Sequence, residues 1–286
     1  MANILYGAPV GQALNEKTAE IVEKLKKKGI TPTLATVRVG TKDDDVAYEK
    51  NAVKRCEALG MKVVTNVMNE DVEAEAFYEK MKEINGDPAI HGILLFRPLP
   101  SHIDEEKARN LIAPEKDVDG CCDLSLASLL TGKGNGFPPA TAQAVMEILN
   151  YYKIPVKGAK AAVLGRSLVI GKPVALLLLN NNATVTICHT RTLNTEEVCR
   201  NSDIIVSATG QIESFGRSYF RSGQTVIDVG IKYSEEKHRI CGDIIFEEVE
   251  PRVENITPVP KGVGSVTTAV LACHLAQAAE RTISHE

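Results

Sequence analysis

AAVLGRSLVIGKP, residues 161–173, is the stretch that decides the fold. Its first four residues are apolar and predict a short buried strand, and apolar residues follow at helical spacing from Lys172 onward. Between these two segments, Gly165 allows a tight turn and the small side chain of Ser167 allows close approach of a pyrophosphate. The start of the helix would present free N–H groups and a positive dipole end to such a group. The stretch therefore predicts a strand–turn–helix unit that binds phosphate.

The spacing of this loop is G-x-S-x-x-x-G-x-P, whereas the usual Rossmann fingerprint is G-x-G-x-x-G. The proline fits the first turn of the helix, where its missing N–H costs nothing. The predicted cofactor contacts in the loop are Gly165, Arg166, Ser167, Gly171 and Pro173. The alternative is an ordinary strand-to-helix turn whose glycines bind no ligand.

The end of the next expected strand bears on which dinucleotide would bind. An NAD site usually has an acidic residue about 20 positions after the first glycine, bonded to the ribose 2′-hydroxyl. Here the strand ends in CHTRT, residues 188–192, and no acid follows until Glu196. Arg191 with Thr190 or Thr192 could hold a 2′-phosphate, because a guanidinium matches phosphate geometry, and Arg166 is a second candidate. His189 is a further predicted cofactor contact. The pattern favours NADP and leaves NAD open; the alternative is that Arg191 is a solvated loop residue.

Helical and strand-like apolar runs alternate along the whole chain. Helices are expected at 10–28, 48–59, 71–84, 172–181 and 267–281. Strands are expected at 33–39, 62–67, 90–95, 161–164, 184–188, 204–207 and 225–228. This alternation predicts an α/β fold in which helices cover parallel sheets.

The stretch from 129 to 141 interrupts the alternation with the turn and linker sequence GKGNGFPP. We therefore expect one domain to comprise residues 1–135 plus 270–286, with the last helix packing back on it. Residues 136–269 are expected to form a second domain, a Rossmann-type parallel sheet.

Composition excludes several classes of protein. The net charge is −4, aromatic residues make up 5% of the chain and Trp is absent, which argues against binding to nucleic acid or to a membrane surface. No run of about 18 or more uncharged apolar residues predicts a membrane span, and the N-terminus lacks a secretory signal pattern. The seven Cys are odd in number and contain no C-x-x-C pair, so we expect reduced, mostly buried thiols in the cytoplasm and no metal site. The adjacent pair Cys121 and Cys122 could suggest metal or redox chemistry, but no nearby His completes a ligand set.

Several further segments carry a family resemblance. They are GTKDDDVAY (40–48), GILLFRPLP (92–100), KDVDG (116–120), DVGI (228–231), GDI (242–244) and TPVPKGVG (257–264). Together with the glycine loop and CHTRT, they resemble the methylenetetrahydrofolate dehydrogenase/cyclohydrolase family (FolD). The similarity extends from about residue 9 to about residue 280 and so covers almost the whole chain.

The resemblance implies two α/β domains with a cleft between them, usually in a homodimer, with a tetrahydrofolate derivative as substrate. In such enzymes a hydride passes from 5,10-methylenetetrahydrofolate to the nicotinamide of NADP or NAD, and water then opens the methenyl product to 10-formyltetrahydrofolate. By resemblance, Tyr48 orients the folate ring and Asp119 bonds the pteridine amino and ring N–H groups; these two are the predicted catalytic residues. Other predicted substrate contacts are Ala52, Phe96, Pro98, Pro100, Pro260 and Gly262. The remaining predicted cofactor contacts are Thr209, Gly210, Ile231 and Thr267.

Two positions depart from the family where hydrolysis would take place. The family has a Lys four residues after the Tyr and a Gln before the Leu-Pro-Leu-Pro run, whereas this chain has Ala52 and Phe96. Because a helix turns about 100° per residue, Lys50 and Lys54 would not point where Ala52 points. Asn51 would lie closer, but an amide cannot act as a base at neutral pH. Loss of a general acid/base group costs about 10²–10⁴ in rate, so we expect weak or absent cyclohydrolase activity.

Further departures leave alternatives open. Asp45 replaces a family Ser, the run 138–141 differs from Pro-Cys-Thr-Pro, and Lys261 replaces a family Gly. A bifunctional enzyme with relocated acid/base groups, a non-catalytic paralogue that binds folate or nucleotide, and a dehydrogenase for another small substrate remain possible.

Overall fold

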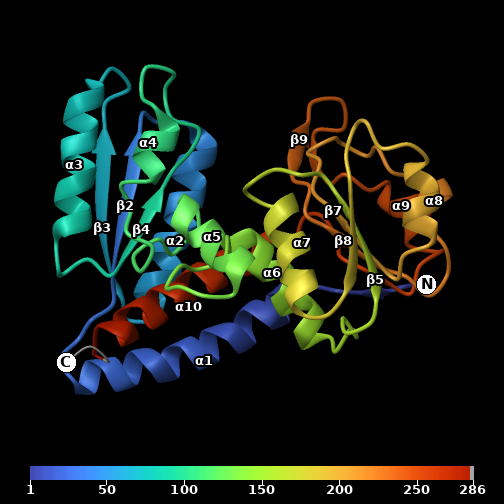
Figure 1. Ribbon diagram of the computed structural model, residues 1–286, viewed down its shortest axis with the longest axis horizontal. Coiled ribbons are helices and arrows are strands. Elements are labelled where there is room, and N and C mark those ends of the chain that lie inside the picture. The colour runs from blue at the N-terminus through green and yellow to red at the C-terminus, as the bar shows by residue number, and fades with distance from the viewer. Residues whose placement is uncertain (284–286) are drawn as a thin grey trace. The chain divides into compact units, whose positions relative to one another are not determined.

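A computed structural model describes residues 1–283 and divides the chain into two compact units (Figure 1). Residues 1–12 and 141–267 form the six-stranded unit, and residues 13–140 with the segment from 268 onward form the three-stranded unit. Both sheets are parallel and carry helices, so the predicted α/β fold class is confirmed.

The N-terminal residues differ from the expected domain division. Residues 1–12 were expected in the first domain, but strand β1 (Asn3–Ile4) pairs in parallel with β11 (Asn255–Ile256) of the six-stranded unit. The other borders, at 140/141 and 267/268, lie near the expected 135/136 and 269/270. Residues 284–286 of the expected final segment lie outside the described part of the chain.

The three-stranded sheet has the order β3-β2-β4, comprising β2 (Thr33–Val39), β3 (Lys62–Met68) and β4 (Gly92–Leu95). Its helices are α1 (Gly7–Lys27), α2 (Asp43–Ala58), α3 (Ala74–Gly86), α4 (Glu105–Arg109), α5 (Asp123–Thr131) and α10 (Gly264–Ile283). Both α1 and α10 begin in the other unit and continue into this one. Figure 1 shows α2 and α3 on opposite sides of the sheet.

Side chains alternate between the two faces of this sheet, as a strand requires. Ile93 and Leu95 of β4 join a buried cluster with α3 and α4. Leu94 and Phe96 join the opposite cluster, which contains side chains of α1, α2 and α10. The last helix therefore packs on this unit, as predicted, and Phe96 faces the same side as α2.

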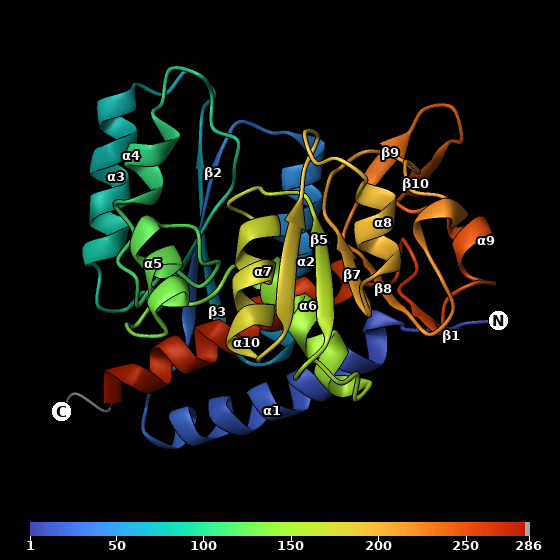
Figure 2. The same cartoon turned by 45° about the vertical axis from the view of Figure 1, so that its right-hand side comes forward.

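The six-stranded sheet has the order β1-β11-β8-β7-β5-β6, and every pairing in it is parallel. Its central strands are β5 (Lys160–Leu164), β6 (Thr184–Cys188), β7 (Ile204–Ser207) and β8 (Thr225–Asp228). Its helices are α6 (Ala140–Tyr151), α7 (Gly171–Asn180), α8 (Thr195–Arg200), α9 (Phe246–Val249) and the 3₁₀ turn η1 (Arg217–Tyr219). A hairpin of β9 (Lys232–Ser234) and β10 (Arg239–Cys241) follows β8. Figure 2 shows α7 and α8 on opposite sides of the sheet.

The strand order creates a switch point at β5. From β5 the chain moves outward to β6, then returns to β7 on the other side of β5. In open parallel sheets, ligands bind outside the carboxyl ends of the strands at such a point. The predicted phosphate loop follows β5 and therefore lies at this position.

Several predicted elements are reproduced, including the strands 33–39, 184–188, 204–207 and 225–228. Helix α2 begins at Asp43, earlier than the predicted Tyr48, with three acidic residues in its first turn that suit the positive end of the helix dipole. All seven Cys are buried, somewhat more completely than predicted. In residues 1–283, no helix has the length and apolar content needed to cross a membrane.

Candidate active site

Two glycines shape the loop after β5. Gly165 has φ +112°, and a Cβ there would lie 2.4 Å from the carbonyl oxygen of Ala208, directly after β7. A Cβ on Gly171 would lie 2.4 Å from the carbonyl oxygen of Gly165. Both positions therefore exclude a side chain, and the structure brings the ends of β5 and β7 together at the switch point.

Ser167 and the start of α7 complete this loop. The Ser167 hydroxyl accepts hydrogen bonds from the backbone N–H groups of Ile170 at 3.2 Å and Gly171 at 3.4 Å. Arg166 and Ser167 are exposed, whereas Pro173 is buried in the first turn of α7. The loop is therefore ordered by its own contacts and leaves the Arg166 side chain in solvent.

The turn after β6 is held by its own side chains. The N–H of His189 donates to the Thr192 hydroxyl at 2.9 Å, and the N–H of Arg191 donates to Nδ1 of His189 at 3.1 Å. Thr190 and Arg191 are exposed, and neither Arg191 nor Arg166 makes an ion pair with any described residue. The predicted 2′-phosphate ligands are thus available to a solvent-side ligand.

The remaining predicted cofactor residues follow β7 and β8 or begin α10. The N–H of Thr209 donates to the Asp243 carboxylate at 2.7 Å, and Gly210 beside it is exposed. Ile231 is 62% exposed although it is a large apolar side chain. Thr267 is buried, and its hydroxyl donates to the Val263 carbonyl at 3.4 Å. Ile231 therefore lies free for contact, whereas Thr267 lies within the packed helix.

Two predicted substrate contacts, Pro260 and Gly262, also lie in the six-stranded unit. Pro260 is exposed, and Gly262 is buried where a Cβ would lie 2.4 Å from the Pro258 carbonyl oxygen. Between them Lys261 has φ +82°, in the left-handed region that favours glycine. The departure from the family Gly therefore keeps the glycine-like backbone.

In the three-stranded unit, Tyr48, Ala52 and Phe96 meet at one apolar surface. Ala52 is 1% exposed and belongs to the same buried cluster as Phe96, with Tyr48 packed against it. The rings of Tyr48 and Phe96 lie edge to face, with centroids 6.0 Å apart and planes at 77°. The two departures from the family thus lie together beside Tyr48 and form an apolar wall.

No neighbouring side chain of α2 replaces the missing ammonium at this wall. Lys50, Asn51 and Lys54 are all exposed, whereas Ala52 is buried. This agrees with the helical geometry predicted from the sequence.

Asp119 provides the titratable group near this wall. Its partial burial raises its pKa to about 7, against the opposing effect of the Arg97 guanidinium. Among the hydrogen bonds of residues 1–283, none involves the Asp119 carboxylate. Burial and the charge of Asp119 raise the pKa of Tyr48 well above its ordinary value. Tyr48 is therefore a neutral phenol near pH 7, and the Asp119 oxygens are left for N–H donors of a ligand.

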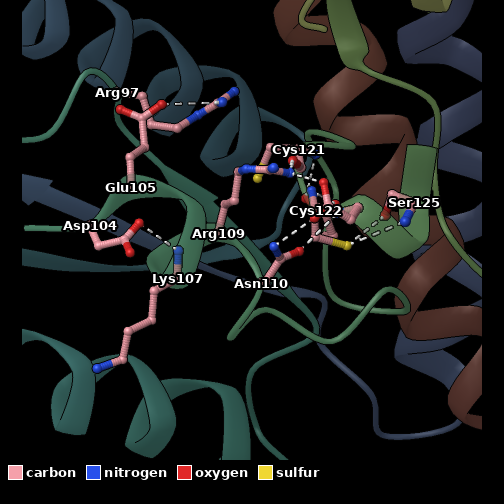
Figure 3. Close-up of polar contacts among 11 residues, drawn as sticks. Arg97, Asp104, Glu105, Lys107, Arg109, Asn110, Cys121, Cys122 and Ser125 are labelled. Carbon is pink, nitrogen blue, oxygen red and sulfur yellow. Dashed lines mark hydrogen bonds and ion pairs between the residues drawn. The ribbon is translucent and has the colours of Figure 1, made fainter. Parts of the chain in front are cut away.

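A network around Glu105 orders the segment that carries Pro98 and Pro100. One carboxylate oxygen of Glu105 lies 3.8 Å from Nη1 of Arg97 (Figure 3). The other carboxylate oxygen accepts the Leu99 N–H at 3.1 Å. At the exposed surface of the same segment, Nζ of Lys42 donates to the Pro98 carbonyl at 3.1 Å. Pro98 is exposed and Pro100 partly buried. No role is predicted from the sequence for Arg97, Glu105 or Lys42, although Arg97 stands directly before the proline run.

The two Asp residues of the KDVDG segment have different roles. Asp117 is fully buried and accepts the N–H groups of Cys121 at 3.0 Å and Cys122 at 2.8 Å. The Cys122 thiol caps α5 by accepting the Ser125 N–H at 3.3 Å, as Figure 3 shows. Asp117 and the adjacent cysteines therefore maintain the turn, and Asp119 is the carboxylate free for chemistry. Within residues 1–283, no group of three His, Cys, Asp or Glu side chains could hold a metal ion.

Comparisons with known proteins agree along the whole chain. The family model described as tetrahydrofolate dehydrogenase/cyclohydrolase, catalytic domain, matches residues 5–119, and the corresponding NAD(P)-binding domain model matches residues 139–283. A protein of Carboxydothermus hydrogenoformans named bifunctional protein FolD is 50% identical over 281 residues, which cover 98% of each chain.

Solved structures of FolD enzymes are also similar to this chain over almost its whole length. The bifunctional FolD methylenetetrahydrofolate dehydrogenase/cyclohydrolase of Campylobacter jejuni has a TM-score of 0.95 at 34% identity and covers 99% of this chain and 100% of its own. The FolD of Trypanosoma brucei, solved with NADP and an inhibitor, has a TM-score of 0.92 at 33% identity and covers 99% of this chain and 98% of its own.

Proposed function

Since this chain belongs to the tetrahydrofolate dehydrogenase/cyclohydrolase family, we propose that it oxidises 5,10-methylenetetrahydrofolate to 5,10-methenyltetrahydrofolate with NADP⁺ or NAD⁺. We further propose that hydrolysis of the methenyl product is weak or absent. The observation that carries this second part is the apolar wall of Tyr48, Ala52 and Phe96.

The wall bears on the two steps differently. Hydride transfer needs two bound partners in the correct orientation, whereas hydrolysis needs a group that accepts a proton from water. Ala52 offers no proton acceptor. The buried Phe96 ring is apolar and gives a water molecule no hydrogen-bond partner. The wall therefore supports the first step, while positions 52 and 96 supply no base for the second.

Asp119 and Tyr48 would orient the folate. A carboxylate accepts two or more hydrogen bonds, and the free oxygens of Asp119 suit the adjacent amino and ring N–H groups of a pterin. Tyr48 is protonated near neutral pH, as an ordinary phenol is, and its raised pKa moves it further from ionisation, so it acts as a packing surface and hydrogen-bond donor. The Phe96 ring supports it from the side.

The loops after β5, β6 and β7 fit a dinucleotide. Gly165 and Gly171 allow the loop after β5 to pack closely against the carbonyl groups of Ala208 and Gly165, and α7 begins beside it. When bound, the nicotinamide supplies the hydride acceptor. NADP is favoured because Arg166 and Arg191 are exposed and unpaired among the described residues. The first acid after β6, Glu196, is bonded to Arg200 at 3.3 Å and to Ser218 at 3.0 Å.

We also propose that the protein forms a homodimer in the cytoplasm. Strand β6 is the last in its sheet, so its outer backbone groups have no strand partner among the described residues. Ile187 on it and the nearby Leu179 and Leu193 are exposed apolar side chains, which suit a contact with a second copy. Seven buried free thiols suit a reducing compartment.

One alternative has a specific observation in its favour. The relative at 50% identity is named bifunctional. If this chain also opens the methenyl ring, another group must activate water. Asp45 lies one turn before Tyr48 on α2, and partial burial raises its pKa. It is the candidate base of that alternative.

The decisive assay follows methenyl absorbance and reduced-cofactor absorbance together, with NADP⁺ and with NAD⁺. We expect the wild type to reduce the cofactor while methenyl product accumulates. The variant Ala52→Lys with Phe96→Gln should hydrolyse the methenyl product about 100-fold faster or more than wild type, because it provides an acid/base group in a polar setting.

Asn51→Lys is the matched control, since it adds a lysine one residue away on the exposed side of α2. This variant should leave methenyl hydrolysis at the wild-type rate. If the wild type hydrolyses the methenyl product as fast as the product forms, the proposal that hydrolysis is weak or absent is wrong. Folate binding without reduction of either cofactor would instead identify a non-catalytic paralogue.

A further inference from the structure

The carboxylate of Asp228 joins the end of β8 to two other loop segments. Its Oδ1 accepts the N–H groups of Gly230 at 3.0 Å and Asp243 at 3.1 Å. Its Oδ2 accepts the N–H of Ile244 at 3.0 Å, and the residue is 4% exposed. Three N–H donors on one buried carboxylate fix the DVGI segment against the GDI segment.

Asp243 extends this network to the end of β7. Its Oδ2 accepts the Ser207 hydroxyl at 2.8 Å and the Thr209 N–H at 2.7 Å, and the residue is 1% exposed. Thr209 and the exposed Gly210 are predicted cofactor contacts. The second carboxylate therefore fixes the loop after β7 to the same point as the first.

Two glycines make the arrangement possible, each serving the other loop's carboxylate. A Cβ on Gly242 would lie 2.0 Å from Oδ2 of Asp228, and a Cβ on Gly230 would lie 2.3 Å from Oδ1 of Asp243. Neither contact can be relieved by a flexible chain end, because both carboxylates are buried and bonded. The glycines of DVGI and GDI are thus required by the two acids.

A third loop is attached through Thr257. Its hydroxyl accepts the Asp228 N–H at 2.8 Å, and Thr257 directly precedes the segment that contains Pro260 and Gly262. The carboxyl ends of β7, β8 and β11 and their loops therefore converge on Asp228 and Asp243. Of the predicted cofactor contacts, Thr209 is bonded within this network, and Gly210 and Ile231 each directly follow one of its members.

We propose that Asp228 and Asp243 are positioning residues that hold the loops carrying Thr209, Gly210 and Ile231 in the arrangement that binds the dinucleotide. The role rests on the proposed function, because it concerns the nicotinamide side of that site. Neither acid contacts the cofactor; each acts through the backbone groups it holds. An amide at 228 has one acceptor oxygen and cannot serve donors at both carboxylate positions.

The test measures the dissociation constant of NADP⁺ by titration calorimetry, alongside thermal unfolding and steady-state kinetics. Asp228→Asn and Asp243→Ala should each weaken NADP⁺ binding about tenfold or more and raise the KM for the dinucleotide. The KM for the folate should stay within about twofold of wild type. Asp243→Asn keeps an acceptor for Ser207 and Thr209 and should weaken binding less than Asp243→Ala.

Asp203→Asn is the matched control, because Asp203 also joins strands but at the amino end of the sheet. Its carboxylate accepts the Lys160 N–H at 2.9 Å and pairs with Arg221 at 3.2 Å. This variant should lose thermal stability without a change in the NADP⁺ dissociation constant. Equal effects of Asp203→Asn and Asp228→Asn on binding would overturn the positioning role.

Two further outcomes separate the inference from the proposed function. Wild-type protein that binds neither NADP⁺ nor NAD⁺ would remove the proposed function itself. Wild-type binding with unchanged affinity in Asp228→Asn and Asp243→Ala would overturn the inference alone. If both variants fail to fold, Ser207→Ala removes one donor and leaves both carboxylates; it should still weaken NADP⁺ binding measurably, and unchanged affinity would count against the role.

Discussion

The two units depart from their family in different ways. In the three-stranded unit, Ala52 and Phe96 place apolar groups where the family has an amine and an amide, so the change removes chemistry. In the six-stranded unit, Lys261 replaces a glycine but keeps φ +82°, so the backbone conformation is retained. Gly165 and Gly171 lie where a side chain would meet backbone, and Asp228 and Asp243 are buried and bonded to loop N–H groups.

This contrast shows which requirement each unit meets. A dinucleotide site depends on close backbone approach and on fixed loops, and those features are intact. Water activation needs a titratable side chain, and neither Ala52 nor Phe96 provides one. The proposal that hydride transfer is kept while hydrolysis is weak or absent rests on this difference, because the two steps depend on different parts of the molecule.

The largest effect is expected on the intact side, at Gly165. Gly165→Val adds a branched side chain at φ +112°, with its Cβ 2.4 Å from the Ala208 carbonyl oxygen. Left-handed backbone in such a residue costs about 1–3 kcal/mol before the clash is counted. Binding of NADP⁺, measured by calorimetry, should weaken about 100-fold or more, while folate binding should persist.

Gly158→Val provides the control for backbone strain. Gly158 has φ +80°, but no heavy atom lies within 4 Å of its Cβ position. The variant should lose stability and keep its affinity for NADP⁺. Equal losses of affinity in the two variants would show that the close backbone packing at Gly165 has no special part in binding.

The next largest effect tests the altered side, at Asp119. Asp119→Asn removes a charged acceptor, and a hydrogen bond to a charged group contributes about 1.5–3 kcal/mol. The kcat/KM for the folate should fall about 10- to 100-fold at pH 8, with little change in NADP⁺ binding. In the wild type, kcat/KM should fall as the pH drops through about 7, because Asp119 becomes protonated there. The measurement needs saturating dinucleotide, since Asp228 also has its pKa raised to about 7 by burial.

The stability of the same variant has a definite sign. Burial raises the pKa of Asp119 from 3.8 to about 7, so the folded protein binds this proton more tightly than the unfolded chain. Its contribution to stability is fully present below about pH 4 and is lost as the pH rises through about 7. Relative to wild type, Asp119→Asn should therefore gain thermal stability between pH 6 and pH 8. A variant with unchanged pH dependence in both kcat/KM and stability would show that Asp119 does not titrate in this range.

The sequence predicted the strands around both sites because their signals are local. Thr33–Val39 is a continuous buried run bounded by a proline and a glycine, and it was predicted to the residue. The position of Ala52 on the Tyr48 side of α2 followed from helical periodicity alone. Such features depend on residues within a few positions of one another.

Features that depend on distant pairing were not predicted. Strand β1 has two residues, and its partner β11 lies 252 positions away, so no periodicity marks it. The segments DVGI and GDI were recognised, but their link through Asp228 and Asp243 depends on how three strand ends meet. A glycine two residues after one acid and another directly before the second acid are the only local trace of that link.

The smallest expected effect tests whether the departure at Lys261 is only conformational. A non-glycine residue in the left-handed region costs about 1–2 kcal/mol, whereas glycine loses about 0.5–1 kcal/mol more entropy on folding. Lys261→Gly should therefore stabilise the protein by about 1 kcal/mol or less, measured by urea unfolding, with the dinucleotide KM unchanged. Lys153→Gly, at φ 57° near the end of α6, should give a similar gain in stability. A change in dinucleotide KM in Lys261→Gly, but not in Lys153→Gly, would show that the Lys261 side chain contributes to the site and that the six-stranded unit has also changed its chemistry.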